Sequence, residues 1–199
     1  IDAVGTLDMN DGNPATADGQ LFLYGNWTNT INNDAFDRGN GTVHFTGLAP
    51  QIINNVAPLG TERFYNVVLN NNFITADSND LVAEGTLTIN SGKSLTIDSN
   101  GYVVAHKKLT HNGNLLIEDN GQFIQGEVID SNDGNYSGSL FQVKRDALVN
   151  KFDYVYWSSP TENYNISGIV GSPKYYWDPI AINANSTQGN WIAASGIML

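Results

Sequence analysis

The stretch that decides the fold is LTIDSNG at residues 95–101, which returns as LLIEDNG at residues 115–121 with every position displaced by 20. Each copy opens with apolar side chains at alternate positions, the pattern of a strand with one buried face. Each copy then closes on Asn-Gly, a strong turn signal. A strand and turn that recur at a fixed interval of about 20 residues are typical of a solenoid.

Apolar residues extend this repeat along the chain in three columns, at spacings of 20 to 24 residues. The first column is Leu21, Val43, Val67, Leu87 and Leu109, accompanied by Leu23, Phe45, Leu69, Ile89 and His111. The second is Ile52, Ile74, Leu95 and Leu115, and the third is Leu59, Leu81, Val103 and Phe123. Three columns in a fixed order predict a right-handed parallel β-helix with three strands per coil. An antiparallel sandwich also has closely spaced short strands and is the alternative.

Composition agrees with an all-β chain that turns often. Asn (27 residues) and Gly (20 residues) fill nearly a quarter of the sequence, and both tolerate the left-handed backbone of tight turns. No stretch shows apolar residues at helical spacing over three turns. Asn70, Asn90 and Asn112 follow the first strand of successive repeats, so we expect left-handed corners there with stacked amides.

The sequence divides into three parts. Residues 1–125 form the β-helical region, in which residues 1–20 serve as an entry cap or a link to a preceding repeat. Residues 126–138 are rich in polar and turn residues and are interpreted as a linker. Residues 139–199 are crowded with aromatic residues and predict a second β unit resembling a sandwich, truncated at its C-terminus. We therefore expect the chain to be an excerpt of a longer protein.

Charge and composition exclude several functions. The formal net charge of −11 repels phosphate backbones, which argues against nucleic-acid binding. No apolar run approaches the roughly 20 residues of a membrane span, so membrane insertion is not expected. The absence of cysteine removes disulfides, thiolate metal sites and cysteine nucleophiles.

The sequence resembles a module of very large surface and secreted proteins of Bacteroidota. The resemblance is carried by Val143-Lys144-Arg145, Phe152 to Pro160 (FDYVYWSSP), Tyr175 to Asp178 (YYWD), Gly189 to Ile192 (GNWI), and upstream by Phe64 to Asn71 and Gly85 to Gly92. Such proteins are usually type IX secretion cargo and include gliding-motility adhesins. The resemblance implies an exported protein, extracellular or at the cell surface, adhesive or filamentous. It transfers no catalytic residue.

The aromatic block supplies the candidate ligand-binding residues Trp157, Tyr175, Tyr176 and Trp177. Aromatic rings stack on the faces of sugars, so glycans or other surface polymers are the expected ligands. The alternative is that these rings form the core of the second unit, which the alternation around Trp157 favours. Exposure of the rings in the structure distinguishes the two interpretations.

Two Asp/Asn-rich stretches, Asp8 to Asn13 and Asp130 to Asn135, resemble loops that wrap calcium. The candidate ligands in them are Asp8, Asn10, Asp130 and Asn132. Both stretches lack the bidentate Glu that closes such a loop, and ordinary polar turns are the alternative. No other cofactor is expected.

No sequence motif of a hydrolase nucleophile, a zinc protease, a phosphate loop or a dinucleotide site occurs. Asp98 and Glu118 occupy equivalent positions in successive repeats, as a carbohydrate-active β-helix enzyme would require, but a solvated turn pair is the simpler explanation. We expect a non-enzymatic adhesin segment that acts in cell-surface attachment. A structural stalk or filament subunit, contacting neighbouring domains or like subunits, and a carbohydrate-active enzyme remain alternatives.

Overall fold

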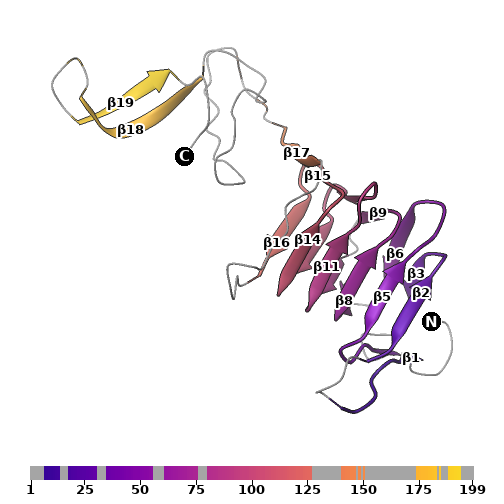
Figure 1. The fold of residues 1–199 in the computed structure, drawn as a ribbon. Coiled ribbons are helices and arrows are strands. Elements are labelled where there is room, and N and C mark those ends of the chain that lie inside the picture. Colours follow the sequence, from indigo (N-terminus) through magenta and orange to yellow (C-terminus); the bar gives the residue numbers. More distant parts are fainter. Residues whose placement is uncertain are drawn as a thin grey trace. The chain divides into compact units, whose positions relative to one another are not determined.

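The computed structural model describes residues 7–13, 18–30, 35–55, 61–75, 80–126, 140–146, 148, 150, 174–182, 184 and 188–193, and the regular elements in them are strands (Figure 1). The strands are β1 (Leu7–Asp8), β2 (Gln20–Leu23), β3 (Trp27–Asn29), β4 (Phe36–Asp37), β5 (Thr42–Phe45), β6 (Gln51–Asn55), β7 (Thr61–Phe64), β8 (Asn66–Leu69), β9 (Asn72–Thr75), β10 (Asp80–Ala83), β11 (Thr86–Ile89), β12 (Ser94–Ile97), β13 (Tyr102–Ala105), β14 (Lys108–His111), β15 (Asn114–Ile117), β16 (Gln122–Gln125), β17 (Leu140–Val143), β18 (Tyr175–Ile182) and β19 (Gln188–Ala193).

Most of these strands belong to three parallel sheets. The first sheet contains β2, β5, β8, β11 and β14, and the second contains β3, β6, β9, β12, β15 and β17. The third contains β7, β10, β13 and β16. The chain visits the three sheets in turn, so β5 to β16 make four successive coils of a β-solenoid (Figure 1). This confirms the predicted parallel β-helix with three strands per coil, because the antiparallel alternative requires the opposite pairing.

The register of the first sheet is the predicted one. Leu87 lies opposite Val67 on one side and Leu109 on the other. Ile89 lies between Leu69 and His111 in the same way. These inward side chains are buried, and each contributes about 1.5–3 kcal/mol when fully removed from water. The inward face of a coil is therefore covered by the coils before and after it.

The register of the second sheet differs from the prediction by one residue. Leu95 lies opposite Phe73, and Ile74 lies opposite Thr96. Ile52 pairs with Ile74 as predicted, but this pair belongs to the outward row of the sheet. Phe73 is fully buried instead. Two adjacent apolar residues fit either face of a strand, and a slip of one residue exchanges the two faces.

The third column was correct from Leu81 onward. Leu81 pairs with Val103, which pairs with Phe123. On its other side Leu81 pairs with Glu62, whereas the predicted partner Leu59 lies outside the described residues. A carboxyl group thus occupies a position in the core where an apolar residue was expected.

Glu62 is 1% exposed and is held by two side chains of the preceding coil. Its Oε2 accepts hydrogen bonds from the indole Nε1 of Trp27 at 2.7 Å and the amide Nδ2 of Asn29 at 3.0 Å. Burial raises the pKa of this carboxyl group above its ordinary value, although both hydrogen bonds act in the opposite direction. The group is satisfied by hydrogen bonds, as a buried polar atom must be.

The corners of the solenoid use Asn in two ways. The Nδ2 of Asn90 donates to the Oδ1 of Asn70 in the coil before it, so the predicted amide stacking is confirmed for this pair. The predicted left-handed backbone is wrong for Asn70, Asn90 and Asn112. It occurs at Asn100 and Asn120, with φ of 64° and 63°. These two residues end the DSN and EDN turns of the repeat that opened the sequence analysis, where the next strand must start after a tight reversal.

The solenoid continues beyond the predicted boundary at residue 126. Leu140–Val143, expected in the second unit, forms β17 and pairs with β15, and Phe141 lies opposite Leu115. The guanidinium of Arg145 then donates to the backbone oxygens of Glu118 at 3.0 Å and Gly121 at 2.9 Å. The first compact unit accordingly runs from Ile1 to Asp146 and the second from Ala147 to Leu199. A strand that aligns only after a long insertion has no fixed spacing, so the repeat pattern missed it.

At the N-terminal end, β1 pairs in parallel with β4, as expected for an entry segment that stacks on the first coil. The side chains of Leu7 and Met9 pack against the core. In the second unit, β18 and β19 form an antiparallel pair. No second sheet that would complete a sandwich is present among the described residues of this unit.

Candidate functional site

The candidate binding residues of the second unit lie on the β18–β19 pair. Trp177 and Trp191 are directly opposite each other, and their rings meet edge to face with centroids 5.3 Å apart. Tyr175 lies two residues before Trp177 and so shares its face, because side chains alternate along a strand. Tyr176 lies on the opposite face, opposite Ile192. We call Tyr175, Trp177 and Trp191 the aromatic face.

The rings of the aromatic face are exposed. Tyr175 and Trp177 are each 51% exposed and Trp191 is 48% exposed. Tyr176 on the other side is 44% exposed. An aromatic core would bury these rings almost completely, so the geometry of the described pair favours the binding interpretation.

Local features of the two strands hold the tryptophan pair in place. Gly189 has φ of +95°, and a Cβ atom built there would lie 2.3 Å from Cζ2 of Trp177. The missing side chain therefore gives the indole its room, and the ring covers a glycine in the neighbouring strand. The Oδ1 of Asp178 accepts hydrogen bonds from the backbone N–H of Ile180 at 2.9 Å and of Ala181 at 3.1 Å. These bonds satisfy the backbone at the irregularity that follows Asp178.

The sequence prediction of this site was partial. Tyr175, Tyr176 and Trp177 are on the exposed pair, whereas Trp157 lies outside the described residues. Trp191 was seen as part of the aromatic block but was not selected as a site residue. Only the cross-strand register brings it to Trp177, and no spacing rule gives that register across a connection of this length.

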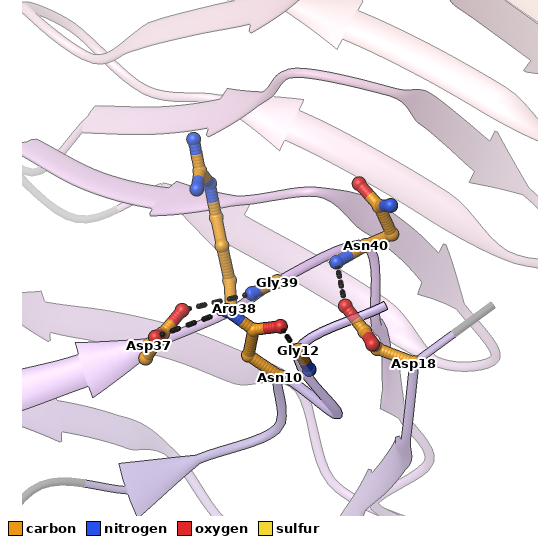
Figure 2. Close-up of a pocket in the computed structure, with 7 residues that line it drawn as sticks. All are labelled: Asn10, Gly12, Asp18, Asp37, Arg38, Gly39 and Asn40. Atoms are coloured by element: carbon orange, nitrogen blue, oxygen red, sulfur yellow. Dashed lines mark hydrogen bonds between the residues drawn. The ribbon is translucent and has the colours of Figure 1, made fainter. Parts of the chain in front are cut away.

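The first candidate calcium stretch forms one wall of a pocket of about 330 Å³ at the N-terminal end of the solenoid (Figure 2). Its polar side chains bind backbone N–H groups. Asp8 Oδ1 accepts from Asn10 N at 2.8 Å, and Asn10 Oδ1 accepts from Gly12 N at 2.8 Å. Backbone N–H groups of Asn40 and Asp11 hold the pKa of Asp18 below its usual value.

These contacts are those of polar turns. No group of three or more His, Asp or Glu side chains suited to a metal ion occurs in the described part of the chain. Asp130 and Asn132, the ligands expected in the second stretch, are outside that part. Calcium binding therefore stays a prediction for both stretches.

Asp98 and Glu118 occupy equivalent turn positions, as the repeat predicted. The backbone oxygen of each accepts from a glycine three residues later, Gly101 at 2.8 Å and Gly121 at 2.9 Å. The carboxylate of Glu118 is bound by the Nζ of Lys144 at 2.7 Å. An ion pair of this kind favours a structural role for Glu118 over that of a catalytic acid.

Comparison with known proteins gives one match. A family model described as a domain of unknown function (DUF8693) matches residues 50–199, which begins immediately before β6 and includes the β18–β19 pair. The chain belongs to this family. No curated protein and no solved structure matches it. Membership in DUF8693 therefore assigns no activity. Among the described residues, no helix has the length and apolar character needed to cross a membrane.

Proposed function

We propose that this chain is a non-enzymatic segment of an exported surface adhesin, extracellular or at the cell surface, that acts in attachment through the aromatic face. The observation that carries the proposal is the exposure of Trp177 and Trp191, about half for each ring, in a direct edge-to-face pair. Soluble proteins rarely leave adjacent tryptophans open to water, because each ring would gain from burial.

Glycans are the ligand class that suits this surface best. The axial C–H groups of a sugar ring present an apolar face, and an exposed indole or phenol ring offers a flat apolar surface for it. Tyr175 and Trp177 stand on the same side of β18, roughly 7 Å apart along the strand. A pair at this separation can contact neighbouring sugars of one chain. Hydroxyl groups at the rim of each sugar stay in water, which suits an open face.

The solenoid suits the role of a stiff spacer for this face. Its coils are joined by three continuous parallel sheets, and its core is a continuous row of buried side chains. Stability in such a structure comes from contacts between neighbouring coils, so its length is set by the number of repeats. The resemblance to surface proteins of Bacteroidota is consistent with this arrangement.

Glycan-array binding of the complete chain tests the proposal. The variant Trp177→Ala should lose about tenfold or more in affinity, because a stacked aromatic ring contributes about 1–2 kcal/mol to such a site. Tyr24→Ala is the matched control, because Tyr24 is 75% exposed and lies in the solenoid. Its binding should equal that of the parent. Absence of any glycan ligand, or full binding by Trp177→Ala, would contradict the proposal.

A structural stalk or filament subunit is the second candidate, favoured by the C-terminal end of the solenoid. There β14, β16 and β17 are the last described strands of their sheets. Ile124, Leu140 and Phe141 at this end are 44%, 43% and 38% exposed. An open strand edge beside apolar side chains is a template for another β segment, from a neighbouring domain or a like subunit. Light scattering over a range of concentrations distinguishes this role, because a filament subunit assembles as concentration rises.

A further inference from the structure

A group of cations lies where the chain passes from the third sheet to the first. Arg38 follows β4, Arg63 lies in β7, Lys107 follows β13, and Lys108 opens β14. These are four of the nine Lys and Arg residues of a chain whose formal charge is −11. We call these four residues, with Tyr65 and Glu84, the basic corner.

The backbone stacks the members of the basic corner in successive coils. The N–H of Gly85 donates to the backbone oxygen of Tyr65 at 2.7 Å, and the N–H of Lys107 donates to that of Gly85 at 3.2 Å. Because Gly85 has no side chain, Lys107 reaches across its coil to Tyr65. The Nζ of Lys107 lies 2.9 Å from the Tyr65 hydroxyl and 5.0 Å from the centre of the ring. The cation and the ring are therefore held together at the surface.

Positive charge exceeds negative charge in the basic corner. Glu84 binds both Arg38 and Arg63, the latter with Nη1 to Oε1 at 3.2 Å. Arg38 also lines the acidic pocket of Figure 2, whereas the side chain of Arg63 is 52% exposed. Within the described part of the chain, Lys107 and Lys108 form no ion pair with a carboxylate. Three cations therefore face solvent around a single, already shared carboxylate.

The spacing of these cations suits a particular polyanion. Neighbouring strands of a sheet lie about 4.8 Å apart, so the two steps from β7 to β13 separate Arg63 from Lys107 by roughly 10 Å along the solenoid. This is about the length of a disaccharide. We propose that the basic corner binds an acidic polysaccharide that carries one carboxylate or sulfate per disaccharide, with successive anionic groups at Arg63 and at the Lys107–Lys108 pair, and the intervening sugar beside Tyr65.

Two features favour a polysaccharide over a nucleic acid. A duplex carries one charge per about 1.7 Å of its axis, far denser than the cations of the corner. The net charge of −11 repels such a dense polyanion, while a sparsely charged polymer pays a smaller penalty. The site is separate from the aromatic face and does not depend on the proposed function of that face.

Binding of hyaluronan, which carries one carboxylate per disaccharide, tests the inference. The complete chain is immobilised, and affinity is measured by biolayer interferometry at low salt with neutral dextran as the blank. The double variant Lys107→Gln/Lys108→Gln should bind about tenfold more weakly, the loss expected for two exposed ion pairs. The matched control Lys93→Gln/Lys174→Gln removes the same charge elsewhere and should stay within about twofold of the parent.

A gain-of-function variant makes the test sharper. Glu84→Gln should bind hyaluronan about threefold to tenfold more tightly, because it frees Arg63 from its carboxylate partner. Melting curves of each variant verify that the solenoid is folded. Lack of hyaluronan binding, equal losses in both double variants, or tighter binding of single-stranded DNA than of hyaluronan would each overturn the proposal. Trp177→Ala should leave hyaluronan binding unchanged, so a failure of the aromatic face and a failure of the basic corner are distinguishable.

Discussion

Replacing Leu95 by Ala measures how much one inward side chain contributes to the solenoid. Leu95 is fully buried and lies between Phe73 in the coil before and Leu115 in the coil after. The substitution removes three buried carbon atoms, worth about 0.8 kcal/mol each, or roughly 2.4 kcal/mol of transfer free energy. The parallel strands on both sides keep the cavity from collapsing, which raises the expected loss to about 3–4 kcal/mol.

Urea unfolding followed by far-UV circular dichroism gives the free energy of unfolding for each variant. The control is Thr96→Ala, which changes the next residue on the outward row and should cost less than about 0.5 kcal/mol. The two substitutions lie on the same strand and are subject to the same local unfolding, so their difference isolates burial. A loss below about 1 kcal/mol for Leu95→Ala, or equal losses for the two variants, would refute the assignment of the inward row.

Three further outcomes are expected. Because burial raises the folded pKa of Glu62, the native state keeps this proton to higher pH than the unfolded chain; its unfolding free energy should therefore fall as pH rises from about 4 through the folded pKa, and a pH series of melting curves for Glu62→Gln should lack that part of the fall. Gly113→Ala should destabilise by about 1–3 kcal/mol in urea unfolding, since its Cβ would lie 2.4 Å from the backbone oxygen of Lys93, whereas Gly25→Ala meets nothing within 4 Å and should be nearly neutral. If either Asp/Asn-rich stretch holds calcium, excess calcium should raise the melting temperature relative to chelator, and identical curves would leave both stretches as polar turns.

Much of the solenoid could be predicted because its physical basis is periodic. An inward side chain recurs once per coil, and the coil length of 20 to 24 residues leaves little freedom between strands. Leu87, Leu109 and their partners therefore appear at fixed intervals in the sequence and at equal positions in neighbouring strands. His111 fits the same column and is 3% exposed, although it is not an apolar residue.

The remaining features depend on contacts between residues that no interval relates. Ile74 and Phe73 are both apolar, and only the hydrogen-bond register decides that Phe73 faces the core. Glu62 occupies a core position because Trp27 and Asn29 satisfy its carboxyl group, and polarity alone would place it outside. For the candidate site, the aromatic residues were evident in the sequence, but their exposure and the pairing of Trp177 with Trp191 were not.

The sequence by itself determined the parallel solenoid, its three strands per coil and the composition of its inward columns, because burial repeated at a constant interval leaves a periodic trace in the residues. The tertiary structure decided the one-residue register of the second sheet, the inclusion of β17, the exposed tryptophan pair and the assembly of the basic corner. Each of these depends on which strands are neighbours and which faces meet water. Those are properties of the packed coils, and a single repeat does not encode them.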